Sequence, residues 1–309
     1  MAFSEVIKVQ EFDCADSVLL EFVKSSDTER LFRGQGDSTW GLAPSVCRDR
    51  HTSFFLESVV DERFPDGPKV FNEIVNLSNF LNACDRSGLR VSGDSHMLRH
   101  ALENLVIPNS ESRHVDPIKY SGRWPGNDRS ILQFMAQAQH HGVSTRLLDW
   151  SKSPVVAIYF AIEQLIRQFD QEASAGDLCV SKVRELITDQ KLAVFSLDIK
   201  SVNAYREQFT VVNVPGFTSV NLAAQQGVFT VMQGHETSEL DMLQNKHLLH
   251  LFTKYTFPIR LVPELYEKCS LLGVNAATMY PGYDGAAKMC RQEVLIADLR
   301  QKLLNLNET

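Results

Sequence analysis

The chain has 309 residues, of which 44% are hydrophobic and 22% are charged. This is the composition of an ordinary globular protein, which excludes disorder, collagen and coiled coil as descriptions of the whole chain. The 38 acidic and 31 basic residues give a formal net charge of −7. A mainly electrostatic nucleic-acid binder would need a basic face, so the charge argues against that class and leaves only a local basic groove open.

The sequence also bears on the compartment of the protein. The N-terminus has no basic stretch followed by an apolar run, so we expect no secretory signal. The most apolar stretch, Val155 to Ile162, is far shorter than the about 20 residues of a membrane span. The six cysteines form no CxxC pair, and no Cys or His pair has the spacing of zinc ligands with a second pair beside it. We therefore predict a cytoplasmic protein with reduced thiols, no membrane partner and no metal.

The spacing of apolar residues predicts the elements in chain order. A helix through Val18 to Val23, capped by Asp16 or Ser17, precedes a strand over residues 31–34. A helical insert over about 52–106 and a loop over 107–128 follow. Helices are then predicted over 129–140, capped by Asn127 or Asp128, and over 155–169. The last elements are strands over 192–197, 228–232 and 257–261 and helices over 263–273 and from 286 onward. We interpret the chain as a single α+β domain over residues 1–309, with a small mixed or antiparallel sheet and a helical insert in its first half.

The first segment with candidate functional residues is Phe32-Arg33-Gly34-Gln35, followed by Trp40 to Ser45 and by Arg48. An arginine beside a glycine at a strand end can reach a ligand while the backbone stays close. Its guanidinium donates two parallel hydrogen bonds to phosphate or carboxylate. The alternative is that Arg33 pairs with a core carboxylate such as Asp149, and the segment taken alone favours this alternative.

The densest polar segment runs from Gln137 to Ser151 and contains two adjacent histidines, His140 and His141. Adjacent residues point to different sides of any regular element, so at most one of these histidines faces a given site. Histidine titrates near neutral pH and is a common general acid or base. The alternative is a helix that ends at Gly142, with the histidines near its last carbonyl groups. That alternative does not explain the whole polar cluster.

Two shorter segments follow. In Gln225-Gln226-Gly227-Val228-Phe229 a glutamine can recognise an amide or hold a water, but it cannot act as a base or carry charge. The alternative is a strand with a bulge glycine at Gly227. The segment Tyr280-Pro281-Gly282-Tyr283-Asp284-Gly285 has the residues of a turn, and it leaves a role for Asp284 near a site open.

In this order the four segments resemble the FRG domain family, whose (F/Y)RG motif is matched by Phe32-Arg33-Gly34. The long family pattern A-Q-H-[HY]-G-x-x-T-R-L-L-D-W is matched from Ala138 to Trp150. The shorter patterns W-x-L-x-P-S, S-P-x-x-A-x-Y-F-A, Q-x-G-x-F and P-x-x-D-G are matched at residues 40–45, 153–161, 225–229 and 281–285. The resemblance covers a core of about residues 28–290, and Asn221 stands where the family pattern leads us to expect an arginine.

The chain is also, more loosely, similar to ADP-ribosyltransferases, which have an arginine on a first strand, a Ser-Thr-Ser-type strand that runs into an A-x-x-F helix, and a late glutamate. Arg33-Gly34 is similar to the first element, and the segment from Asp149 to Phe160 is similar to the second. Gln225 or Glu293 would take the late position. This resemblance implies NAD as the substrate, an ADP-ribosyltransferase or NAD glycohydrolase activity, and a toxin or anti-phage effector with an unknown macromolecular acceptor.

The resemblances imply a site with a catalytic and a substrate-binding part. The candidates for catalysis are His140, His141, Asp149, Gln225 and Glu293. The candidates for substrate binding are Arg33, Gly34, Gln35, Thr145, Arg146, Trp150, Ser151, Ser153 and Gly227. In this interpretation arginine holds the pyrophosphate, and a carboxylate stabilises the cation that develops in the transition state.

Two other hypotheses stay open. A module of the same fold would bind a nucleotide or another phosphate-bearing ligand without turnover, and the glutamine at the late position favours this. Alternatively, Arg33, Arg146 and Asp149 would form a buried ion network that only ties the strand to the central helix. A nuclease ranks lower, since Asp149 with Asp284 makes a thin case for a metal-binding group.

Overall fold

The computed structural model describes residues 6–24, 29–48, 67–105, 124–174, 189–205, 209–215, 220–233 and 242–307. At its centre lies one seven-stranded sheet in the order β1-β7-β4-β2-β3-β6-β5. Neighbouring strands pair antiparallel, except that β1 pairs parallel with β7 at one edge. The strands are β1 (Lys8–Glu11), β2 (Arg30–Gln35), β3 (Leu148–Ser151), β4 (Lys191–Asp198), β5 (Phe209–Val212), β6 (Gly227–Met232) and β7 (Phe252–Pro258). The predicted α+β domain with a mixed sheet is confirmed.

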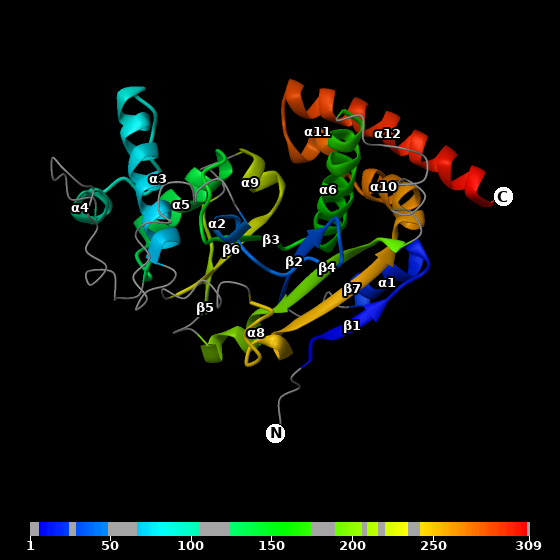
Figure 1. The fold of residues 1–309 in the computed structure, drawn as a ribbon, viewed down its shortest axis with the longest axis horizontal. Helices are drawn as coiled ribbons and strands as arrows, with labels where there is room; N and C mark the ends of the chain where they lie inside the picture. The colour runs from blue at the N-terminus through cyan, green and yellow to red at the C-terminus, as the bar shows by residue number, and fades with distance from the viewer. Residues whose placement is uncertain are drawn as a thin grey trace.

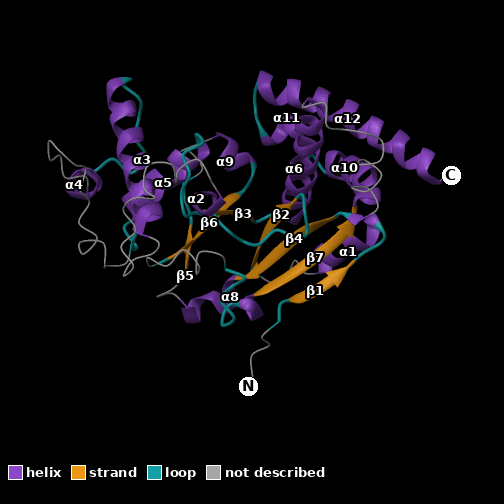
Figure 2. Ribbon diagram, in the orientation of Figure 1, coloured by secondary structure: helices purple, strands orange, loops and turns teal. Residues whose placement is uncertain are grey.

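Helices gather in two groups along this sheet (Figures 1 and 2). The helices α3, α4 and α5 lie at the end of the sheet formed by β5 and β6, whereas α6, α10, α11 and α12 lie together over its middle and far end. The helices are α1 (Ala15–Lys24), α2 (Ser45–Arg48), α3 (Gly67–Arg86), α4 (His96–Leu105), α5 (Arg129–His140), α6 (Pro154–Ser174), α8 (Ile199–Val202), α9 (Val220–Ala224), α10 (Val262–Leu271), α11 (Ala276–Met279) and α12 (Tyr283–Asn307).

The alternation of side chains along β4 places the core on both faces of the sheet. Leu192 and Val194 pack toward α6 and the C-terminal helices, while Ala193 and Phe195 pack on the opposite face. A third hydrophobic cluster joins α3, α4 and α5 to β5 and β6. Both faces of the middle strands are therefore covered, which explains why their sequences are almost continuously apolar.

The helix α6 is the element that most closely approaches the sheet. It begins at Pro154, where a missing N–H costs nothing, and the Ser153 hydroxyl accepts a hydrogen bond from the Val156 amide at 3.4 Å. A Cβ atom on Gly34 would lie 1.8 Å from the carbonyl oxygen of Ala157. Gly34 is therefore required for the contact between β2 and α6.

The helical insert is tied to the sheet by a buried ion pair. Glu73 on α3 and Arg146, just before β3, are 0% and 2% exposed, and Arg146 Nε donates to Glu73 Oε2 at 2.7 Å. The Arg146 backbone amide donates to Glu73 Oε1 at 2.7 Å, and Trp124 Nε1 donates to Glu73 Oε2 at 3.0 Å. The carboxylate thus holds three donors that come from two other segments of the chain.

Most of the predicted elements are present in the structure, with shifted boundaries and one wrong strand. The predicted insert contains α3 and α4, while residues 49–66 of the chain lie outside the described residues. Asp128 caps α5, since its side chain accepts from the Ser130 amide. The strand expected over 257–261 is wrong: β7 ends at Pro258, which has no N–H for further pairing, and Ile259–Leu261 is a 3₁₀ turn.

Other differences lie at the N-terminal side and in short strands. The helix α1 begins at Ala15, so Asp16 lies in its first turn and neither Asp16 nor Ser17 is its cap. The strands β1, β3 and β5, each of four residues, were not predicted from the spacing of apolar residues, and β3 was implied only by the looser resemblance. Within the described part of the chain, no helix combines the length and the apolar character needed to cross a membrane.

Candidate functional site

The sheet opens between its two central strands, and this opening defines the candidate site. β2 pairs with β4 along its whole length, from Arg30 to Gln35, but it pairs with β3 at one position, Phe32 with Ser151. Beyond that pair the Arg33 side chain bridges the two strands: its Nη1 atom donates to the backbone oxygen of Asp149 at 2.7 Å. The guanidinium thus takes the place of a backbone hydrogen bond where the strands separate.

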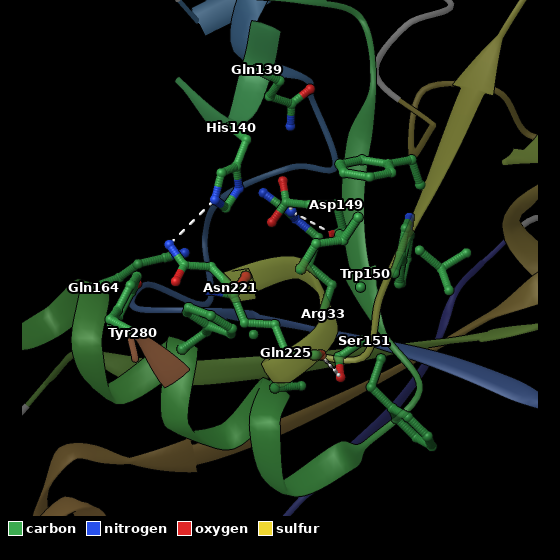
Figure 3. A pocket seen from close by; sticks show the side chains of 18 residues that line it. Arg33, Gln139, His140, Asp149, Trp150, Ser151, Gln164, Asn221, Gln225 and Tyr280 are labelled. Carbon is green, nitrogen blue, oxygen red and sulfur yellow. Dashed lines mark hydrogen bonds and ion pairs between the residues drawn. The ribbon is translucent and has the colours of Figure 1, made fainter. Parts of the chain in front are cut away.

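The same Arg33 nitrogen also holds the Asp149 carboxylate, with 2.7 Å between Nη1 and Oδ1 (Figure 3). The Arg33 side chain is 5% exposed, whereas the Asp149 side chain is 62% exposed. The pairing of Arg33 with Asp149 was the alternative prediction, and the structure confirms it. Arg33 is therefore a buried residue that positions Asp149, and the carboxylate is the partner that solvent reaches.

Asp149 faces a pocket of about 300 Å³ that lies between β2, β3, β6 and α6. The surrounding protein disfavours its charge, but the Arg33 guanidinium outweighs this by its charge and its hydrogen bond. Arg48 at the end of α2 adds a smaller attraction, so the pKa of Asp149 lies below its ordinary value of 3.8. The pocket thus contains a carboxylate that is ionised at neutral pH. The Arg48 contribution was not predicted, although Arg48 closes the first polar segment of the sequence.

His140 lines the pocket and His141 does not. The two rings lie edge to face with 5.8 Å between their centroids, and His141 is exposed and stacks on Phe80 with 6.3 Å between ring centroids. Burial, and then the charge of His141, lower the pKa of His140 from 6.5. Asn221 Nδ2 lies 3.3 Å from His140 Nε2 (Figure 3), and because an amide nitrogen only donates, this ring nitrogen is the acceptor. His140 is thus a neutral ring that Asn221 orients.

Gln225 lines the pocket at the end of α9, and its Nε2 atom donates to the backbone oxygen of Met279 at 3.2 Å. The Ser151 hydroxyl donates to the Gln225 backbone oxygen at 2.8 Å and accepts from the Ser153 amide at 3.0 Å. Ser151 therefore joins the Gln225 turn to the start of α6. Gly227 begins β6 at this wall, where a Cβ atom would lie 2.3 Å from the Leu222 side chain.

Several predicted site residues lie away from this pocket. Glu293 is exposed on α12 and lines a separate surface depression together with Tyr266 and Arg300. The structure therefore does not bring Glu293 to Asp149, because α12 is packed against α10 and α11 on the far side of α6.

Other candidates for substrate binding have structural roles instead. Thr145 is buried and donates to Gln139 Oε1 at 2.5 Å. Arg146 is bound by Glu73, so the predicted network of Arg33, Arg146 and Asp149 is wrong in its second member. Gln35 Nε2 donates to the Gly41 backbone oxygen at 2.9 Å. Ser153 caps α6, and of the remaining candidates Gly34, Trp150, Ser151 and Gly227 line the pocket.

The structure adds pocket residues that were not predicted as site residues. The polar and aromatic ones on which the site depends are Gln139, Phe160, Gln164, Asn221 and Tyr280. Phe160 and Gln164 are four residues apart on α6 and so share one face of the helix. Helical spacing around the A-x-x-F segment was the signal that could have identified Gln164. Tyr280 reaches the pocket from the turn between α11 and α12. It opens the fourth of the segments singled out in the sequence, but the turn residues of that segment gave no sign that its ring faces a site.

Among the described residues, no group of three or more His, Cys, Asp or Glu side chains is arranged to hold a metal ion. Comparisons with curated proteins and with solved structures found no match. A comparison with protein-family models found one family, the FRG domain, over residues 28–170. That segment contains β2, Arg33, the insert, His140, Asp149 and most of α6, and thus one side of the pocket. Residues 28–170, somewhat less than half of the chain, therefore match the FRG domain.

Proposed function

We propose that this protein cleaves the bond between nicotinamide and ribose in NAD, with Asp149 as the catalytic carboxylate. The observation that carries the proposal is the ionised Asp149 side chain, which Arg33 fixes in a pocket lined by both polar and apolar residues. The reaction would be hydrolysis, or transfer of ADP-ribose to an acceptor. Loss of NAD halts growth, so such an activity would suit a toxin or an anti-phage effector.

The chemistry needs a negative charge beside the sugar. When the bond from ribose to the pyridinium nitrogen breaks, the electron pair leaves with nicotinamide, and positive charge develops on the ribose ring. A fixed carboxylate stabilises that charge in the transition state. Water then adds to the sugar carbon, and its proton passes to solvent. Asp149 has a lowered pKa and a solvent-accessible carboxylate, which are the properties that this role requires.

The roles within the site differ from those that the resemblance implied. Arg33 is 5% exposed and already bonded to Asp149, so we assign it to the positioning of the carboxylate and not to phosphate binding. Arg48 is exposed at the end of α2 and is coupled by charge to Asp149. It is the arginine that we assign to the diphosphate of the substrate.

The volume of the pocket limits what enters it. At about 300 Å³ it lies at the lower end of the range for ligand pockets, about 300–1,000 Å³. This space suits one nucleoside-sized group, so we expect the nicotinamide riboside half of NAD to enter and the adenosine half to remain outside. His140 and Asn221, which both line the pocket, would hydrogen-bond the ribose hydroxyls.

A binding module without turnover is the second candidate. It is favoured by Gln225, because in the resemblance to ADP-ribosyltransferases this glutamine would take the place of their late glutamate, and an amide cannot carry charge. In that case the pocket would hold a nucleotide, and Asp149 would accept hydrogen bonds from its sugar.

The products of the reaction separate these possibilities. Purified protein is incubated with NAD, and free nicotinamide and free ADP-ribose are quantified by chromatography. Equal amounts of both products would establish hydrolysis, and nicotinamide in excess of ADP-ribose would indicate transfer to the protein. If neither product forms while NAD raises the melting temperature, the enzyme proposal is refuted and the binding module stands.

A further inference from the structure

We propose that Phe160, Tyr280, Gln164 and Gln225 form a subsite for a flat aromatic carboxamide. This inference rests on the proposed function, where the carboxamide is the nicotinamide group of the substrate. The four residues line the pocket that contains Asp149. We call them the aromatic corner.

The two rings of the aromatic corner are fixed relative to each other. Phe160 and Tyr280 have ring centroids 6.5 Å apart and ring planes at 89°, so they form two walls at a right angle. A planar ligand ring in such a corner stacks on one wall and meets the other with its edge. This is the preferred geometry for aromatic contacts.

Tyr280 is held in place from behind the pocket by a buried charge. Its hydroxyl donates to the Glu163 carboxylate, whose oxygens lie 2.8 Å and 3.0 Å away, and Glu163 is 2% exposed. Lys288 forms an ion pair with the same carboxylate, and its Nζ atom lies 3.8 Å from the centroid of the Tyr280 ring. Arg167 Nη2 is 3.1 Å from Glu163. The tyrosine ring therefore belongs to a rigid network, which favours a preformed wall over a mobile one.

Two glutamines give the aromatic corner a defined polar edge. Gln164 Oε1 accepts from the Gly36 amide at 3.1 Å, which leaves its Nε2 amide as the group available to a ligand. Gln225 Nε2 donates to the Met279 backbone oxygen at 3.2 Å, which leaves its Oε1 oxygen available. One fixed donor and one fixed acceptor thus line the same pocket as the two rings.

This pattern matches a carboxamide, which carries one acceptor oxygen and one donor NH₂ group. The Gln164 amide would donate to the ligand oxygen, and Gln225 Oε1 would accept from the ligand NH₂. A carboxylate in the same place would have no proton for Gln225 and would present an oxygen to an oxygen. The aromatic corner should therefore distinguish nicotinamide from nicotinic acid, because a site built for an N–H rejects the analogue that lacks it.

The inference can be tested without turnover. The dissociation constants of free nicotinamide, nicotinic acid and adenosine are measured by NMR titration of the 309-residue chain. We expect nicotinamide to bind at least about tenfold more tightly than nicotinic acid. Tyr280→Leu should weaken nicotinamide binding by about tenfold or more, because one aromatic stack is lost, and Tyr280→Phe should retain it. Tyr283, which is 96% exposed, provides the matched control, and Tyr283→Leu should leave binding unchanged.

A second variant keeps the inference testable if Tyr280→Leu does not fold. Gln164→Leu removes the donor while keeping a similar volume, and it should reduce the preference for nicotinamide over nicotinic acid. Equal affinities of the wild type for both compounds, or tighter binding of adenosine than of nicotinamide, would overturn the inference. Its failure is distinguishable from that of the proposed function. If the protein releases nicotinamide from NAD but does not bind free nicotinamide, only the proposal of the aromatic corner is refuted. If it binds free nicotinamide but releases none from NAD, only the enzyme proposal is refuted.

Discussion

The Glu73 carboxylate binds Arg146 in the buried contact between α3 and the start of β3, so its replacement tests how the helical insert is joined to the sheet. In Glu73→Ala the guanidinium of Arg146, 2% exposed, loses the acceptor of its Nε atom, and its own backbone amide loses a partner 2.7 Å away. The indole N–H of Trp124 loses its acceptor as well. The substitution thus leaves one charge and two neutral donors without this partner in an apolar surrounding.

The size of the effect follows from that count. Breaking a buried ion pair by removing one partner costs about 3–5 kcal/mol, because the remaining charge stays in the interior. An unsatisfied buried donor costs about 1–3 kcal/mol, but the terms are not additive, since the cavity lets water reach some of these groups. We therefore expect Glu73→Ala to lower the free energy of unfolding by about 3–5 kcal/mol.

Urea unfolding monitored by tryptophan fluorescence measures this change, since Trp124 reports directly on the cluster. The matched control is Glu267→Ala, which removes a surface partner of Arg300; these side chains are 55% and 47% exposed. Exposed pairs contribute about 0–1 kcal/mol, so the control should unfold almost like the wild type. If Glu73→Ala lowers the free energy of unfolding by less than about 1 kcal/mol, its effect is no larger than that of a surface pair. That result would refute the claim that this ion pair joins the insert to the sheet.

Three smaller perturbations test other contacts. Gly34→Ala places a methyl group 1.8 Å from a backbone oxygen of α6, so urea unfolding should show a loss of at least about 1–3 kcal/mol. His141→Gln removes a like charge, so an NMR titration should show a higher pKa for His140. The lowered pKa of His140 makes the folded protein less stable as the pH falls below 6.5. The His141→Gln variant should therefore lose less stability in acid than the wild type. An unchanged pKa of His140 in this variant would contradict the interaction between the two histidines. Arg48→Gln removes a charge that helps to keep Asp149 ionised, so the acid limb of the pH–rate profile for NAD cleavage should move to higher pH; a shift to lower pH would oppose this.

Much of the fold could be predicted because its elements have strong local signals. The helix α6 begins with Pro154 after a hydroxyl cap and continues with apolar residues on most of its surface, and β4 is an apolar run between polar ends. The strands β1 and β5 gave no such signal, since each has four residues and is stabilised by pairing at an edge of the sheet. Pairing partners distant in sequence cannot be read from a short segment.

The candidate site could be predicted only in part, for the same reason. Asp149 and His140 were identified because they lie in one dense polar segment, and the pairing of Arg33 with Asp149 was foreseen as an alternative. The exclusion of Glu293 and Arg146 depends on how α12 and α3 pack, which no local pattern encodes. The sequence could predict that only one of the adjacent residues His140 and His141 faces a site. Which of the two faces the pocket depends on the tertiary structure.

The most direct test of the central claim compares the rates of nicotinamide release from NAD by Asp149→Asn and by His141→Gln. The measurement is made at pH 8, where histidine is neutral, after urea unfolding has shown that both variants are folded. Asparagine keeps an oxygen for Arg33 but lacks the negative charge, so we predict a rate at least about 100-fold below wild type. His141 lies outside the pocket, and its variant should cleave NAD at the wild-type rate. An Asp149→Asn protein that releases nicotinamide as fast as His141→Gln would contradict the assignment of Asp149 as the catalytic carboxylate.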